Sequence, residues 1–431
     1  MVYYGETSRF LSFIGLIALS AYLSLFSGLA GIYIKKSLSS NILSYFIIPF
    51  IWVSKDILVE KIFGGFPWCF AGYSQYKNIY FIQMAEIGGI HLITFFLIYF
   101  NILFYLLFKY KNKKLILVII ISFIFIYSDG YFLYKRNNHE IKEIKTHIAG
   151  IIQPNTKNDP NLNYQEKIIK LEELFNDSIK LKEKGAEFII WPEYTVSIYP
   201  LQNNFFKRKF LNFTNSNVPI FAGFTDLKNS KEIYNSVILF QKNKSEKYDK
   251  VHLTPFGEYI PFRKLLFFVK KITDEIGDFT FGKSVHNLKI HNHFASTPIC
   301  YEIIFPELIR KFISNGGELI ITISNDSWFG DSSAPLQHLS MAIFRSIENR
   351  RYILRSTSNG ISALISSSGE IIYQSPSHKK DTFITKFKYL TKKTFFTKYG
   401  YIFPYFCMIL VIVYFIKIKF FPKRKNLKLF K

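Results

Sequence analysis

The chain is poor in the residues that build disulfide frameworks and metal clusters. Only three of its 431 residues are cysteine, and they lie far apart, at Cys69, Cys300 and Cys407. Three scattered cysteines cannot form a disulfide framework, and no CxxC or Cys/His spacing typical of a metal site is present. We therefore expect no structural disulfides and no bound metal, and no motif indicates a cofactor.

Nucleotide-binding and nucleic-acid-binding motifs are also missing. The sequence contains no Walker loop, no GxGxxG and no RNA-binding aromatic motif. Its formal charge of +24 is therefore weak evidence for a nucleic-acid partner, and we expect none. With 49% hydrophobic and 18% aromatic residues, the chain is too apolar for an ordinary soluble enzyme. A basic membrane protein is the simpler interpretation.

Long apolar segments are what the chain has instead. A helix needs about 20 mostly apolar residues to cross a bilayer. Five segments meet this requirement, at 10–34, 42–60, 84–108, 115–134 and 401–421. The second is the weakest candidate, because it contains Lys55 and Asp56, which should face other protein rather than lipid.

The basic loops predict how these segments are oriented. Short loops rich in Lys and Arg stay in the cytoplasm, and such loops occur at 35–36, at 109–114 and in the tail from 419. Alternation across five spans then exports the whole middle of the chain. The expected domains are N-terminal transmembrane helices over 1–134, an exported domain over 135–400, and a C-terminal helix with a basic cytoplasmic tail over 401–431.

The middle of the chain has an α/β pattern. Strand-like runs such as "HIAGIIQ", "FIIWPE" and "GELIITIS" alternate with segments that have helical spacing, as over 164–187. Two stretches, 202–217 and 261–271, fit neither a strand nor a core. The second has five apolar residues between basic pairs, which predicts an arm resting in the membrane, and 205–210 is a candidate second arm.

Three reactive side chains follow strand-like segments of this domain. Glu193 ends "FIIWPE", Lys250 follows "KYD", and Cys300 lies in "TPICYE". Open α/β sheets place their sites at strand ends, and a base, a cation and a thiol suit acyl transfer through a thioester. Taken singly, each has an ordinary alternative: a carboxylate at a helix start, a solvated lysine and a buried cysteine.

The order of these residues and their motifs resembles a known family. "WPE", "DKVHLTPFGEYIP" and "ICYE" are similar to the nitrilase, or carbon–nitrogen hydrolase, superfamily. Held between membrane spans, such a domain resembles the bacterial apolipoprotein N-acyltransferases, as do "AYLSLFSGLAG", "GFPWCFAGYSQ", "SNDSWFGDSSAPLQH" and "RSTSNGISA". The resemblance covers almost the whole chain. It implies an αββα sandwich inserted between transmembrane α-helices, in the bacterial inner membrane, with the catalytic domain facing the periplasm.

The resemblance also implies a site and a reaction. Cys300 would be the nucleophile, Glu193 the general base and Lys250 the donor to the oxyanion. A membrane phospholipid would supply the acyl group, and a diacylglyceryl apolipoprotein would accept it. Supporting or substrate-binding roles would fall to Glu258, Tyr301, Glu302, Asn325, Asp326 and Trp328.

Alternatives and departures from the family remain. A membrane-anchored amidase would use the same three residues with water as the acceptor, whereas the intact set disfavours an inactive scaffold. The family normally has more spans ahead of "AYLSL", so we expect the opening helical pair to be missing. Its early loop usually carries Trp after Lys, but here Lys157 precedes Asn158. We expect lipid to be held differently there, and we expect a monomer.

Overall fold

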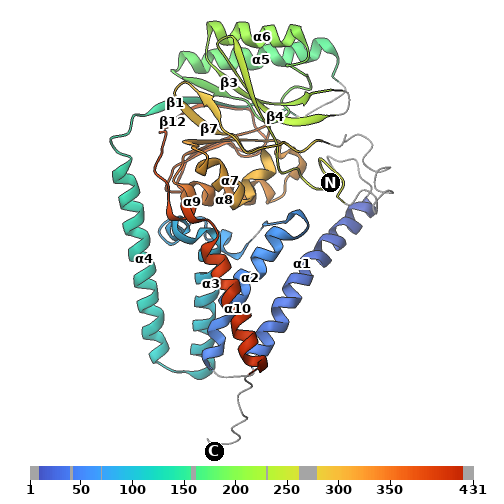
Figure 1. Cartoon of the computed structure of the whole chain (residues 1–431). Helices are drawn as coiled ribbons and strands as arrows, with labels where there is room; N and C mark the ends of the chain where they lie inside the picture. Colours follow the sequence, from blue (N-terminus) through green and yellow to red (C-terminus); the bar gives the residue numbers. More distant parts are fainter. Residues whose placement is uncertain are drawn as a thin grey trace, which may run out of the picture.

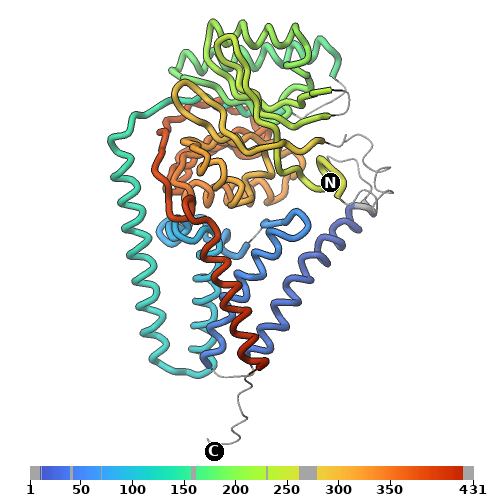
Figure 2. The backbone as a smooth tube through the Cα atoms, in the orientation of Figure 1, coloured from blue at the N-terminus to red at the C-terminus, as the bar shows by residue number. Residues whose placement is uncertain are grey.

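A computed structural model describes residues 9–38, 42–68, 70–156, 162–229, 232–261 and 279–420. Figure 1 shows a layered α/β domain standing on a bundle of long helices. The chain begins in the bundle, builds the layered domain and returns to the bundle with its last helix (Figure 2). The predicted membrane arm from 262 onward, Asn158 and Cys69 lie outside the described residues.

Within the described ranges, five helical segments are long and apolar enough to cross a membrane, and they coincide with the five apolar runs of the sequence. Large apolar side chains such as Phe104, Phe125 and Phe132 are exposed on them, which suits contact with lipid. The long helices are α1 (Arg9–Ser37), α2 (Ile48–Lys61), α3 (Ala85–Tyr110), α4 (Lys114–Glu140) and α10 (Ile402–Phe420). Shorter turns join them: η1 (Ile42–Ile47), η2 (Ile62–Gly64), η3 (Ala71–Gln75) and η4 (Phe81–Met84).

The first sheet of the layered domain has the strand order β12-β1-β2-β3-β4-β5. Strands β1, β2 and β3 are parallel, and β12 pairs antiparallel with β1. The bounds are β1 (His147–Gln153), β2 (Phe188–Ile190), β3 (Ile220–Leu227), β4 (Ile233–Gln241), β5 (Lys244–Asp249) and β12 (Asp381–Phe387).

The second sheet has the order β11-β10-β9-β8-β7-β6. Its central strands β7, β8 and β9 are parallel. The bounds are β6 (Leu288–Ile290), β7 (His293–Ser296), β8 (Leu319–Ser324), β9 (Ile353–Thr357), β10 (Ala363–Ile365) and β11 (Ile371–Gln374). Strands β1, β2 and β8 are buried on both faces, because their Ile, Ala and Phe side chains fill the space between the sheets and beneath the covering helices.

Helices cover the outer face of each sheet, which completes an αββα sandwich (Figure 1). On the first sheet lie α5 (Tyr164–Glu183) and α6 (Asn204–Ser216), and on the second lie α7 (Pro306–Ser314) and α8 (Ala334–Asn349). Asn163 starts α5 with a capping box, since its side chain accepts from Glu166 N while Glu166 accepts from Asn163 N. The short elements are η6 (Cys300–Ile304), η7 (Asp326–Phe329) and α9 (Phe395–Tyr399).

The sandwich is packed directly onto the bundle. Helix α8 lies between the second sheet and the long helices (Figure 1). Near the start of α3, Gly89 has a φ of +65°, and a Cβ there would lie 2.7 Å from the ring of Phe396 in α9. This close approach requires glycine, because both the backbone angle and the space exclude a side chain.

One prediction from the sequence is wrong. The stretch 202–217, expected to be outside strand and core, forms α6, and Phe206 and Phe210 are 4% and 0% exposed. The Phe210 ring stacks on Phe240 of β4 with centroids 4.3 Å apart. Helix α6 covers the sheet farthest from the bundle (Figure 1), so 205–210 cannot be a membrane arm. The basic residues of this stretch lie on the solvated face of an amphipathic helix.

Candidate active site

Cys300 lies directly after a bridge that extends the pairing of β7 with β8 in the second sheet. Ile299 pairs with Ile323 of β8, and Cys300 then opens η6. Its φ of +48° is in the left-handed region, which a residue with a Cβ rarely adopts and which costs about 1–3 kcal/mol. Such strain persists only where the surroundings enforce it, and it is common at functional sites.

Glu193 follows β2 and is held by two donors from different sheets. It is 3% exposed. Its Oε1 accepts from Asn235 Nδ2 at 2.7 Å, and its Oε2 accepts from the backbone N–H of Asn325 at 2.8 Å. Burial raises the pKa of Glu193, and the positive charge of Lys250, whose Nζ is 3.9 Å from Oε1, opposes that rise. A carboxylate with a raised pKa is suited to accept a proton as a general base.

Lys250 follows β5 and is 1% exposed. Its Nζ lies 2.8 Å from Oε2 of Glu258. Burial by itself lowers the pKa of this lysine, but the negative charges of Glu258 and Glu193 outweigh burial and raise it. Lys250 is therefore a charged donor within the protein interior.

Asn235 of β4 joins the two carboxylates of the cluster. Its Nδ2 donates to Glu193 Oε1 at 2.7 Å and to Glu258 Oε1 at 2.6 Å, and its backbone oxygen accepts from Lys250 N at 2.8 Å. Glu258 is further fixed by the backbone N–H of Thr254 at 2.7 Å. Asn235 was not predicted as a site residue from the sequence. Its only signal was an amide near the start of the mostly apolar strand "IYNSVILFQ".

The thiol of Cys300 is protonated at rest. Burial raises its pKa, the charge of Glu193 raises it further, and Lys250 acts in the opposite direction. Ser324 Oγ lies 3.2 Å from Sγ and donates to Asp326 Oδ1 at 2.5 Å. A neutral thiol of this kind needs a base as it attacks, and Glu193 is the buried carboxylate whose charge acts most strongly on it.

Glu302 ties the chain after Lys250 to the chain around Cys300. Its Oε1 accepts from Tyr248 OH, Val251 N and His252 N at 2.8, 2.8 and 3.0 Å. Its Oε2 accepts from Ile299 N at 2.8 Å. Burial raises the pKa of Glu302 to about 7. The side chain thus holds in register the two segments that carry the cation and the thiol.

Tyr301, Asn325 and Trp328 have different surroundings. Tyr301 is buried, and its hydroxyl donates to Gly65 O at 3.3 Å, so it contacts a loop of the bundle. Asn325 reaches the cluster through its backbone N–H on Glu193. Trp328 is 43% exposed, so its ring lies at the surface and not among the buried groups.

Asp326 belongs to a buried network behind Cys300. Arg355 Nη2 donates to its Oδ2 at 2.8 Å, and His338 Nδ1 lies 3.4 Å from its Oδ1. Burial by itself raises the pKa of Asp326, but Arg355 outweighs burial and lowers it. Burial and Arg355 together lower the pKa of His338, whose Nε2 lies 3.1 Å from the Cys300 carbonyl oxygen. A neutral His338 then donates from Nε2 and supports the strained backbone of Cys300.

Comparisons with known proteins agree with this architecture. Residues 148–390 match the model of the carbon–nitrogen hydrolase family, and residues 1–103 match that of the apolipoprotein N-acyltransferase N-terminal domain. The chain is 32% identical over 426 residues to the apolipoprotein N-acyltransferase of Wigglesworthia glossinidia brevipalpis, covering 95% of this chain and 83% of the relative. It is 28% identical over 421 residues to that of Geobacter metallireducens, covering 94% and 80%.

The chain is also similar to a solved structure. Nit3 of Saccharomyces cerevisiae, a member of the nitrilase superfamily, is 16% identical, covers 57% of this chain and 90% of its own, and has a TM-score of 0.46. Among the residues that our structure describes, no group of three or more His, Cys, Asp and Glu side chains could hold a metal ion.

The fold and the matched family define the class. The sandwich is a carbon–nitrogen hydrolase domain, and it is joined to helices that can cross a membrane. The chain belongs to the apolipoprotein N-acyltransferase family. It is an acyltransferase of the bacterial inner membrane. The fold class and the family predicted from the sequence are thereby confirmed.

Proposed function

We propose that the protein moves a fatty acyl group from a membrane phospholipid to the N-terminal amine of the diacylglyceryl-cysteine of an apolipoprotein. The observation that carries the proposal is the pair of buried charges Glu193 and Lys250 beside the half-buried Cys300, in a domain packed on membrane helices. The names of the relatives support the same reaction. An amidase could use this cluster too, but the family match over 1–103 favours the acyltransferase.

In the first half-reaction, Cys300 Sγ attacks the carbonyl carbon of a phospholipid ester. Glu193 takes the thiol proton as the S–C bond forms. Lys250 Nζ and the backbone N–H of Tyr301 donate to the developing oxyanion, and losing one such donor typically costs about 3–4 kcal/mol of barrier. The C–O bond then breaks, the lysophospholipid oxygen takes the proton back from Glu193, and a thioester remains on Cys300.

In the second half-reaction, the apolipoprotein amine attacks the thioester carbonyl. Glu193 takes a proton from the amine, Lys250 again donates to the oxyanion, and the C–S bond breaks. The sulfur regains a proton from Glu193, so each cycle ends with an amide, a free thiol and a carboxylate. Because the first product leaves before the second substrate reacts, the kinetics are ping-pong.

Glu258 and Asn235 position these groups. Glu258 keeps Lys250 charged, because its Oε2 lies 2.8 Å from Nζ. Asn235 holds Glu193 and Glu258 together, because its Nδ2 donates to both carboxylates. The layered domain, residues 135–400 in the proposed division of the chain, faces the periplasm, since the basic loop at 109–114 joins α3 and α4 at their far ends. The enzyme works as a monomer, without cofactor, metal or nucleic acid.

Trapping the thioester tests the proposal. In phospholipid vesicles the wild type should carry a fatty acid that hydroxylamine releases, and Cys300→Ala should carry none. Cys407→Ala is the matched control, because Cys407 is a buried cysteine of α10, and this variant should be acylated normally. Adding a diacylglyceryl peptide with a free N-terminus should transfer the acyl group to its amine. Acylation of Cys300→Ala, or hydrolysis of small amides without any transfer to the peptide, would contradict the proposal.

A further inference from the structure

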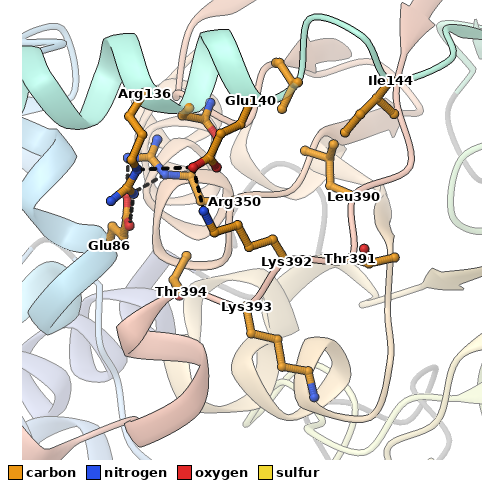
Figure 3. A pocket seen from close by; sticks show the side chains of 12 residues that line it. Glu86, Arg136, Glu140, Ile144, Arg350, Leu390, Thr391, Lys392, Lys393 and Thr394 are labelled. Carbon is orange, nitrogen blue, oxygen red and sulfur yellow. Dashed lines mark hydrogen bonds and ion pairs between the residues drawn. The ribbon is translucent and has the colours of Figure 1, made fainter.

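A cavity of about 370 Å³ lies where the bundle meets the sandwich beside α4. Its walls come from the end of α4, the start of α3, the residue after α8 and the segment that joins β12 to α9 (Figure 3). Helix α4 ends and helix α3 begins at the end of the bundle that faces the sandwich (Figure 1). The cavity is therefore at the boundary between the apolar layer and water.

The cavity is separate from the candidate active site. Glu193 follows the carboxyl end of β2, which is parallel to β1. The cavity residue Ile144 precedes the amino end of β1, and Leu390 follows the end of β12, which is antiparallel to β1. The cavity thus lies at the opposite ends of these strands from Glu193. The substrates of the proposed reaction do not account for it.

One end of the cavity carries more positive than negative charge. Arg350 donates to Glu86 Oε2 from Nε at 2.8 Å and from Nη2 at 2.6 Å, and Arg136 donates to Glu86 Oε1. Lys392 Nζ lies 2.5 Å from Glu140 Oε1. Three cations therefore face two carboxylates at this end, and Lys393, which also lines the cavity, adds a fourth cation (Figure 3). The buried Nε of Arg136 also lacks a hydrogen-bond partner, so a donor as well as a charge is left over.

Apolar groups lie on both sides of these charges, at the far end of the cavity and along α4. Ile144 and Leu390 stand across from the charged groups (Figure 3). Below Arg136, at helical spacings of four and eleven residues, lie Phe132 and Phe125, which are 64% and 60% exposed. A ligand that fits this surface has one anionic group and a long apolar part.

We propose that this cavity binds an anionic phospholipid through its headgroup phosphate, with the acyl chains lying along α4. A phosphodiester carries a negative charge, which suits a lining that has more cations than carboxylates. Its oxygens would accept from Arg136 Nε and from Lys392, and arginine is well suited to phosphate. The bound lipid would join α4 to the segment between β12 and α9, and so hold the sandwich on the bundle.

Lipid binding should be visible as stabilisation of the folded protein, because a ligand that binds only the folded state raises its melting temperature. The experiment uses full-length Cys300→Ala in detergent, so that acyl transfer cannot contribute. Three probes are titrated: phosphatidylglycerol, phosphatidylcholine and inorganic phosphate. Phosphatidylglycerol should raise the melting temperature in a saturable way, and the other two should have little effect.

The variant Arg136→Gln with Lys392→Gln tests the site itself. Each cation near an anionic lipid contributes roughly fivefold in affinity, so the double variant should bind phosphatidylglycerol about 30-fold more weakly. Lys398→Gln removes an exposed cation of α9 that does not line the cavity, and its affinity should equal that of the parent. Each single variant should show an intermediate loss, which provides a second measurement should the double variant fold poorly.

Four results would overturn the proposal. Equal stabilisation by phosphatidylcholine would show that the charge is irrelevant. Saturation by inorganic phosphate, with loss of the lipid effect, would identify a free anion as the ligand. Unchanged phosphatidylglycerol affinity in the double variant, or an equal loss in Lys398→Gln, would place lipid binding elsewhere.

Discussion

Replacing Asn235 by alanine would remove one amide that donates to both carboxylates of the cluster. The bond to Glu193 Oε1 is 2.7 Å long and entirely buried. A hydrogen bond to the charged form of an acid favours that form and lowers its pKa. The pKa of Glu193 is already raised by burial, so losing Asn235 should raise it further.

The magnitude follows from the strength of such bonds. A hydrogen bond to a charged group contributes about 1.5–3 kcal/mol, and about 1.4 kcal/mol corresponds to one pH unit in a titration. The variant should therefore need a pH about one to two units higher before Glu193 can take the Cys300 proton. At saturating pH its rate should approach that of the wild type, because Cys300 and Lys250 are still present.

The assay is the pH dependence of Cys300 alkylation by a small soluble reagent, measured on the full chain in detergent. Gln241→Ala is the control, since Gln241 is a buried amide on the same strand, β4, whose Nε2 donates to a neutral carbonyl, Lys289 O, at 2.9 Å. Its profile should match the wild type. If Asn235→Ala also keeps the wild-type profile, or if both variants shift equally, the role assigned to Asn235 is refuted.

Three further predictions concern stability and orientation. Glu302→Gln should destabilise the sandwich by about 1–3 kcal/mol in chemical denaturation, because its amide would leave the buried N–H of Ile299 without an acceptor; equal stability would contradict this. Arg355→Met should lower the free energy of unfolding by about 3–5 kcal/mol, because it leaves Asp326 buried without its cation. Arg208→Met, at an exposed arginine, is the control, and a smaller loss of stability in Arg355→Met than in this control would refute the prediction. A reporter that is active only in the periplasm should be silent when fused after Lys431, and activity there would overturn the proposed topology.

Several elements followed from local pattern alone. The five apolar runs predicted the five long helices, because spanning a bilayer depends on length and hydropathy, which any segment carries by itself. The αββα class and the family were also predicted from short motifs such as "WPE" and "ICYE", which carry both the strand end and the reactive side chain. The catalytic roles of Glu193, Lys250 and Cys300 stay predictions that the proposed experiments test.

Other elements depended on partners distant in the chain. The stretch 202–217 looked like a basic surface segment, but packing on β4 turned Phe206 and Phe210 into core. Strand β12 was not predicted. It pairs with β1 from more than 200 residues away, and the alternation of "DTFITKF" becomes meaningful only when that pairing buries one face.

The sequence by itself determined which residues can do chemistry and which segments meet lipid, because residue type and apolar length are local properties. Only the tertiary structure decided how the reactive groups are supported. Asn235 is 42 residues from Glu193 in the chain, and Asn325 is 132 residues from it, yet both donate to its carboxylate. Arg355 likewise reaches Asp326 from another strand. Such hydrogen bonds form where the ends of strands from the two sheets come together. No local sequence pattern specifies which strand ends will meet.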